Sequence, residues 1–207
     1  MLALRVSATD IDALRYYLAD DEGDLDDLLA RLRRQAPPTA AMLAGTAFHK
    51  ALETARQGSA DRFEADGHIF VLDDLDADLD LPTVREIKAT REYRVGDVLV
   101  TLVGKVDAVL GKRIDDHKLT GSYDAERFMA GYQWRIYLEV FGADEFRWNI
   151  FEGAEVANRH QVWKVRSLHK LTMHRYPGIA ADVERAVAGF VEFARLHLPE
   201  KFERIAA

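Results

Sequence analysis

The strongest constraint on the fold is a continuous stretch of β-type patterning in the middle of the chain. Arg91–Val95 alternates between polar and apolar residues, and Val98–Leu110 is rich in valine and leucine. The short turn sequences Gly96-Asp97 and Gly111-Lys112 separate these runs from each other and from Arg113–Leu119. Turns this tight join adjacent antiparallel strands. The stretch therefore predicts three antiparallel strands in one sheet.

Helical periodicity flanks this stretch on both sides. Ser7, Thr9 and Asp10 are good caps for a first helix, and Thr39 follows Pro37-Pro38 as a cap for a later one. Further helices are predicted over Asp24–Arg34, from Thr39 to about Arg56 with a stop at Gly58, over Ala125–Phe141 and over Ile179–His197, and further strands near His68–Leu72, Phe146–Phe151 and His160–Leu168.

This order of elements predicts an α+β fold, in which a mixed central β-sheet has an antiparallel three-strand core and helices flank it. The length of 207 residues suits a single domain spanning 1–207. Its N-terminal helices are expected over about 8–57 and its core over about 86–168.

Composition excludes several classes of protein. The chain has no cysteine, which rules out disulfides, thiolate metal sites and a cysteine nucleophile. Its formal net charge of −7 is unlike that of a protein that coats DNA by charge alone. No apolar run is long enough to span a bilayer and the first residues lack a signal-peptide core, so a soluble, cytoplasmic protein without membrane contact is expected. The acidic run Asp73–Pro82 fails the calcium-loop template and is interpreted as a solvated loop.

Two aspartates are predicted to face each other across the second hairpin. If Gly111-Lys112 is a two-residue turn, Asp107 lies opposite Asp116 and Lys105 opposite Lys118. Directly opposed like charges destabilise a sheet, and a divalent cation removes the conflict. Oxygen ligands suit Mg²⁺ or Mn²⁺. The set then holds what phosphodiester hydrolysis needs: carboxylates, a metal, a water and a cation.

Two helical pairs add candidate groups. His49 and Glu53 are four residues apart and share a helix face, so His49 is a candidate metal ligand with Glu53 as its support. Gln133 and Tyr137 are also four apart and can hydrogen-bond a phosphate or sugar. Each pair has a plainer explanation: a partly buried histidine with a surface glutamate, and two polar residues at the edge of an amphipathic helix.

The ordered set of motifs resembles the PD-(D/E)XK nuclease superfamily, in particular its RecB-type exonuclease branch. The resemblance rests on Gly45 and His49 in GTAFHKALE, Gly104-Lys-Val-Asp107, Asp116-His-Lys118, and Gln133 with Tyr137, in that order. It covers about residues 45–137. No proline precedes Asp107, and without cysteines only the catalytic core of the iron–sulfur members is matched.

The resemblance implies a restriction-endonuclease-like fold and an enzyme that hydrolyses DNA to 5′-phosphate and 3′-hydroxyl ends, as a small exonuclease of the phage or recombination and repair type. It assigns metal binding to Asp107, Asp116, the His117 carbonyl and His49. It implies that Lys118 positions or activates the attacking water, and that Gln133 and Tyr137 help to hold the DNA strand. DNA is the expected partner, and a recombination protein or a second copy of the chain would fit the same picture.

Two alternatives stay open at this stage. The first is a catalytically silent DNA-binding or assembly protein on the same fold, which has no reason to keep the acid–acid–lysine set. The second is an unrelated α+β binding module whose hairpin acids are incidental, in which Asp107 and Asp116 would lie far apart or on opposite faces.

Overall fold

The computed structural model describes residues 1–55, 61–72 and 84–205. The helices are α1 (Ala8–Ala19), α2 (Leu25–Leu32), α3 (Ala40–Thr54), α4 (Ala125–Ala130), α5 (Gln133–Phe141) and α6 (Ile179–His197). The strands are β1 (Leu2–Ser7), β2 (Arg62–Ala65), β3 (His68–Val71), β4 (Val84–Val95), β5 (Val98–Leu110), β6 (Arg113–Thr120), β7 (Glu145–Glu155), β8 (Val162–His174) and β9 (Glu203–Arg204).

All of these strands belong to one mixed sheet, in the order β2-β3-β8-β7-β6-β5-β1-β9, with β4 also paired to β5. Pairing is antiparallel between β4 and β5 and between β5 and β6, whereas β1–β5, β6–β7 and β3–β8 are parallel. This confirms the predicted fold class, a mixed sheet with an antiparallel three-strand core flanked by helices.

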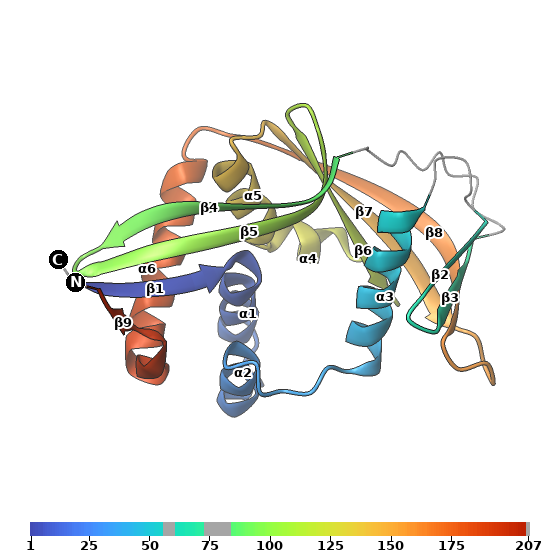
Figure 1. Cartoon of the computed structure of the whole chain (residues 1–207), viewed down its shortest axis with the longest axis horizontal. Coiled ribbons are helices and arrows are strands. Elements are labelled where there is room, and N and C mark those ends of the chain that lie inside the picture. Colours follow the sequence, from blue (N-terminus) through green and yellow to red (C-terminus); the bar gives the residue numbers. More distant parts are fainter. Residues whose placement is uncertain (56–60, 73–83, 206–207) are drawn as a thin grey trace.

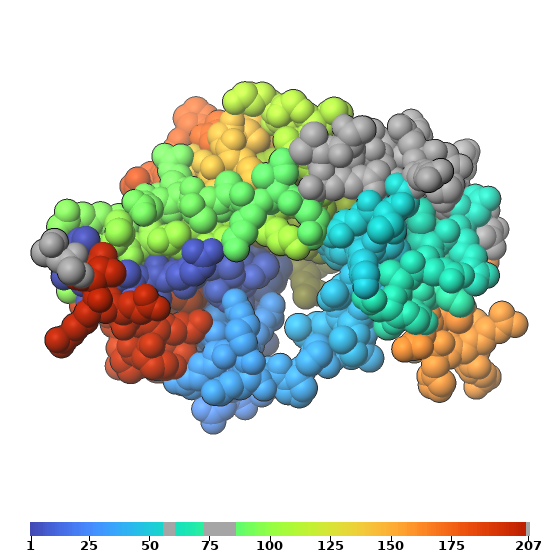
Figure 2. Space-filling model, viewed as in Figure 1, coloured from blue at the N-terminus to red at the C-terminus, as the bar shows by residue number. Residues whose placement is uncertain are grey.

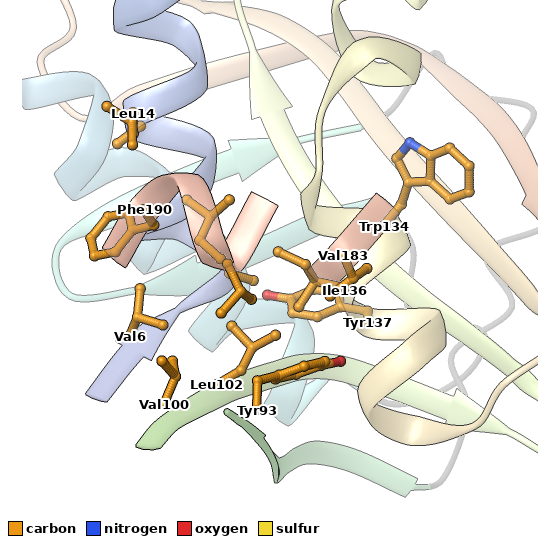
Figure 3. Packing of buried hydrophobic residues seen from close by; sticks show 14 of the residues in the cluster. Val6, Leu14, Tyr93, Val100, Leu102, Trp134, Ile136, Tyr137, Val183 and Phe190 are labelled. Carbon is orange, nitrogen blue, oxygen red and sulfur yellow. The ribbon is translucent and has the colours of Figure 1, made fainter. Parts of the chain in front are cut away.

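Two groups of helices cover the sheet, and each has its own apolar core (Figure 1). The larger core joins α1, α2, α5 and α6 to β1, β5, β6 and β7. Figure 3 shows part of it, with Ile136 and Tyr137 of α5 packed among Leu102, Tyr93 and Val183. In the smaller core, α3 packs Phe48 against Phe70 and Phe151. No helix of the described residues has the length and apolar character needed to cross a membrane.

Local signals predicted most elements correctly. Ser7 caps α1 in a capping box with Asp10, and Thr39 caps α3 through the Met42 N–H. Gly96 and Gly111 adopt the left-handed conformations that their hairpin turns require. The last helix has the predicted bounds, Ile179–His197.

Two predictions were wrong, and three strands were not predicted. The helix expected over Ala125–Phe141 is broken into α4 and α5. The ladder between β5 and β6 has the predicted register but ends at Ala108–Asp115, so the pairs Asp107–Asp116 and Lys105–Lys118 are not formed. Strands β1, β2 and β9 were not predicted. The acidic run Asp73–Pro82 and the helix stop at Gly58 lie outside the described residues.

Candidate active site

The site lies where the sheet forks. Strand β5 pairs along one edge with β1 as far as Val103 and with β6 from Ala108 onward. Between these partners, the segment Gly104–Asp107 has no strand paired to it on that edge among the residues that the structure describes. The N–H of His117 instead donates to Oδ2 of Asp107 at 2.7 Å. The fork therefore opens the sheet at the carboxylate of the G-x-x-D motif.

Asp107 also faces helix α3, where Nδ1 of His49 lies 3.1 Å from its Oδ2. Burial alone would raise the pKa of Asp107, but the hydrogen bond and charge of His49 outweigh burial, so the pKa is lowered to about 2. Asp107 is therefore ionised at neutral pH, and its side chain keeps 22% of its surface exposed.

Asp116 is more deeply buried and is paired with Lys118. Nζ of Lys118 lies 2.7 Å from Oδ2 of Asp116, whose side chain is only 3% exposed. Burial raises the pKa of Asp116 to about 6, the Lys118 charge opposes this rise, and the nearby charge of Asp107 adds to it. For Lys118, burial lowers the pKa, but Asp116 and Asp107 outweigh burial and raise it. The lysine is therefore a charged partner of the acids in the metal-free protein.

The imidazole of His117 is buried on the other face of β6 from Asp116 and Lys118. Burial lowers its pKa to about 4, so the ring is neutral at physiological pH. Its Nδ1 has no hydrogen-bond partner within the described residues. The ring packs edge-on against Phe151 of the smaller core, at a centroid distance of 6.2 Å. The side chain of His117 thus anchors β6, and its backbone N–H serves Asp107.

Gly104 explains how helix α5 reaches the site. A Cβ at this position would lie 2.9 Å from the Phe141 ring and 3.3 Å from the Tyr137 ring. Tyr137 is buried on the glycine, and its hydroxyl accepts a 2.8 Å hydrogen bond from Nε2 of Gln133. Gln133 lines a cavity together with Lys118, so the glutamine lies at the site. The buried Tyr137 fixes its amide through the hydrogen bond.

Asp12 of α1 sets the start of α5, and sequence reasoning missed it. Its carboxylate accepts the backbone N–H groups of Tyr132 and Gln133, and it lies against Gly131. These contacts give the first turn of α5 a cap from outside the helix, and the chain bends at Gly131. Gly131 lies inside the predicted helix and was a signal for a break in it. Asp12 is far away in the sequence, so no local pattern pointed to its role.

A second group of charges borders Asp107. In the β4–β5 ladder Glu86 occupies the position opposite Asp107, its backbone is left-handed at φ 53°, and the Asp107 pair is missing from an otherwise regular register. Lys105 forms an ion pair with Glu86 rather than lying near Lys118. Burial and a hydrogen bond with Glu86 raise the pKa of Glu53. Glu53 thus lies beside Glu86 and within the field of Asp107, and its role as a support for His49 stays a prediction.

The donor set fits a hard divalent cation. Two carboxylates, a neutral carbonyl and an imidazole are ligands that Mg²⁺ or Mn²⁺ accepts. The pKa of the buried Asp116 is raised to about 6, in part by the charge of Asp107. A bound cation would offset the repulsion between the two carboxylates. As the side chains stand, no three His, Cys, Asp or Glu residues of the described chain converge into a metal-binding group. His49 and Lys118 contact the acids instead.

Comparisons with known proteins find likeness in structure alone. No family model matches the sequence, and a search of curated proteins finds no match. The solved structure of SSO0001 aligns at a TM-score of 0.54 and 17% identity, covering 91% of this chain and 75% of that one. A candidate exonuclease from Eubacterium rectale aligns at 0.53 and 11% identity over 95% and 82%. A phage-related exonuclease from Haemophilus somnus 129PT aligns at 0.50 and 9% over 93% and 95%. The chain shares their fold.

Proposed function

We propose that the protein is a divalent-metal-dependent DNA nuclease of the exonuclease type, acting in DNA recombination, repair or phage DNA processing. The observation that carries this is the meeting of Asp107, Asp116 and Lys118 at the fork between β5 and β6, in the order of the PD-(D/E)XK motifs. The shared fold with structures described as exonucleases supports it. In the alternative of an unrelated binding module, the two acids would lie far apart or on opposite faces.

The residues present divide the work of phosphodiester hydrolysis. Asp107, Asp116, the His117 carbonyl and His49 would hold Mg²⁺ or Mn²⁺, which supplies Lewis acidity toward the phosphate and a water of lowered pKa. Lys118, charged and fixed by Asp116, would orient the attacking water and stabilise the charge that develops on the phosphate oxygens. Gln133 would hold the substrate strand, with Tyr137 fixing its amide.

The reaction balances with water as the only co-substrate. The water oxygen bonds to phosphorus, the bond between phosphorus and the 3′ oxygen breaks, and a proton reaches the leaving 3′ oxygen. The products are a 5′-phosphate and a 3′-hydroxyl.

The test is cleavage of end-labelled linear DNA. Wild type should degrade it with Mg²⁺ or Mn²⁺ and not with EDTA, and Lys118→Ala should reduce the rate by about 10²-fold or more while the protein stays folded. Lys105→Ala is a matched control, because Lys105 pairs with Glu86 at the border of the site. DNA binding without cleavage under any metal would instead support the silent DNA-binding alternative.

A further inference from the structure

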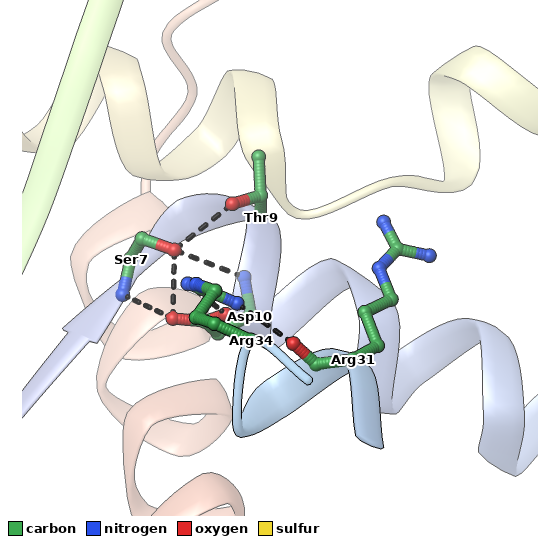
Figure 4. Close-up of polar contacts among 5 residues, drawn as sticks. All are labelled: Ser7, Thr9, Asp10, Arg31 and Arg34. Atoms are coloured by element: carbon green, nitrogen blue, oxygen red, sulfur yellow. Dashed lines mark hydrogen bonds and ion pairs between the residues drawn. The ribbon is translucent and has the colours of Figure 1, made fainter. Parts of the chain in front are cut away.

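The sheet has one long edge that no strand covers. Strand β4 runs over 12 residues and pairs only with β5 among the residues that the structure describes. The edge strand β2 has only 4 residues, and β9 covers the start of β1. The end of β1 is also closed, because Ser7 donates its N–H to Asp10, which Arg34 holds in an ion pair (Figure 4). The side of β4 that faces away from β5, here called the β4 edge, is therefore the longest open edge of the described sheet.

The backbone groups that face the β4 edge are those of its even-numbered residues. Val95 and Val98 flank the two-residue turn Gly96-Asp97, so these valines bond to each other. Because bonded and non-bonded pairs alternate along an antiparallel ladder, the N–H and C=O groups of the even-numbered residues from Lys88 to Arg94 point away from β5. Within the described chain, no other backbone group bonds to them. They are free to pair with a further strand.

The two faces of β4 beside this edge differ in character. The side chains on the outer face are all exposed, and Figure 2 shows the green surface that β4 forms; they belong to Lys88, Thr90, Glu92 and Arg94. Neither Lys88 nor Glu92 has an ion-pair partner among the described residues. On the inner face, Ile87 and Tyr93 pack against the larger core. A strand that joins the edge therefore meets unpaired charges on one face and apolar side chains on the other.

A second copy of β4 complements the first when the two run antiparallel. With the pairing centred on Thr90, Lys88 lies opposite the partner's Glu92, and Glu92 lies opposite the partner's Lys88. Opposite charges stabilise such cross-strand pairs, and like charges destabilise them. On the inner face the same register places Ile87 opposite the partner's Tyr93, which extends the apolar packing across the joint. A two-fold axis through Thr90 makes both halves of the interface identical.

The charges on β4 reject the neighbouring registers. A shift of two residues in one direction places Lys88 opposite the partner's Arg94, and the opposite shift places Glu86 opposite the partner's Glu92. An in-register parallel pairing places Lys88 opposite the partner's Lys88. Charges on an edge strand commonly serve to prevent pairing altogether. Here their order excludes the wrong pairings and leaves one with opposite charges, which is how specificity for a partner is built.

We propose that two copies of the protein pair through the β4 edge, antiparallel and centred on Thr90, into a two-fold dimer with one continuous sheet. This goes beyond the proposed nuclease function and does not depend on it. On the inner side, a hollow of about 410 Å³ between β4 and α6 is lined by Arg91, Glu184 and Ala188 among others, and it gives room for the partner's side chains. The left-handed backbone of Glu86 ends the ladder. The register brings the partner's Arg94 to this acid, so each copy supplies a cation at the border of the other's candidate site.

The first experiment reverses the paired charges. Lys88→Glu and Glu92→Lys each place like charges opposite each other twice in the dimer, so each variant should dimerise about 10-fold or more weakly than wild type. The double variant restores both pairs with the signs exchanged and should dimerise like wild type. The two single variants, mixed, should form a heterodimer with each other. Sedimentation equilibrium measures each affinity, and circular dichroism confirms the fold. Glu64→Lys, which makes the same charge change at an exposed position of β2, is the control and should leave dimerisation unchanged.

The second experiment places a thiol on the two-fold axis. The chain has no cysteine, so Thr90→Cys gives each copy a single thiol. Cα atoms of directly opposed residues lie about 5.5 Å apart in a bonded antiparallel pair, which is within the range of a disulfide. Mild oxidation should therefore yield a covalent dimer. Thr101→Cys is the matched control, because Thr101 lies on the same side of the sheet but one strand farther from the axis, opposite Glu92, and should yield none.

Each outcome decides the proposal without reference to cleavage, since all measurements are made in EDTA and without DNA. A wild type that stays monomeric at its highest soluble concentration overturns the dimer. A dimer that the single charge variants do not weaken uses another surface and overturns the β4 pairing. Failure of the double variant to restore affinity, or no more covalent dimer from Thr90→Cys than from Thr101→Cys, overturns the register. Restored affinity together with a selective disulfide supports it.

Discussion

The two faces of strand β6 hold adjacent buried aspartates with different partners. Asp115 is fully buried and is held by two arginines: Arg113 from its own strand and Arg147 from the paired position on β7, each at 3.0 Å. Asp116 points to the other face and has the flexible ammonium of Lys118. Guanidinium groups fill the hydrogen-bonding capacity of the first carboxylate, whereas the second retains a raised pKa. A satisfied acid stabilises the sheet, and an unsatisfied one is available to a metal and a substrate.

The largest expected effect is on activity. Asp116→Asn should lower kcat/KM on linear DNA by about 10³-fold, because it removes a proposed metal ligand and the partner of Lys118. Asp115→Asn is the matched control, since it changes the neighbouring buried acid, and the protein that remains folded should keep most of its activity. The measurement is initial rate per folded molecule, with folding checked by circular dichroism. Equal losses in both variants would remove the distinction between the two faces.

The next largest effect is on stability, and it concerns Asp115 on the opposite face of β6 from Asp116. Asp115→Ala leaves two arginines, both only partly exposed, without their buried carboxylate and should lower the free energy of unfolding by about 3–5 kcal/mol. Urea unfolding in EDTA measures it. A loss no greater than that of an exposed-acid control such as Glu64→Ala would show that the arginine pairs contribute little.

The pH dependence of stability should separate wild type from Asp116→Asn. The pKa of Asp116 is about 6 in the folded protein against an ordinary value of 3.8, so the folded state binds more protons between these values. Its contribution is fully present below pH 4 and is lost as pH rises through 6, by roughly 2–3 kcal/mol. Urea unfolding of metal-free protein from pH 4 to 7 should show this fall in wild type and not in the variant. Parallel curves would contradict the raised pKa.

Two motif glycines should show the smallest effects, with opposite signs. Gly104→Ala places a methyl group 2.9 Å from the Phe141 ring and should cost about 1–3 kcal/mol. At Gly45, one turn before His49, an added Cβ meets nothing within 4 Å, so Gly45→Ala should stabilise α3 by about 0.5–1 kcal/mol. Thermal melts of both variants measure the difference. Destabilisation by Gly45→Ala would show that this glycine has a structural role.

Local chemistry made most elements predictable from the sequence. Turn glycines, helix caps and apolar periodicity act within a few residues, so the two hairpins, α1, α3 and α6 follow from them. The hairpin register also brought Asp107 and Asp116 to one end of the β5–β6 pair, although the ladder stops one pair short of them.

Only the tertiary structure decided how these elements open into a site. Strand β1 pairs with the first half of the β5 edge, and β6 pairs with the same edge only from Ala108 onward. Asp107 therefore lies at the fork between the two strands. Asp12 breaks a continuous helical pattern at Gly131 and so aims Gln133. Of the partners that distinguish Asp115 from Asp116, Arg113 and Lys118 lie on β6 itself, whereas Arg147 comes from β7. These choices depend on contacts between residues far apart in the chain, whose energies leave no mark on local periodicity or turn chemistry.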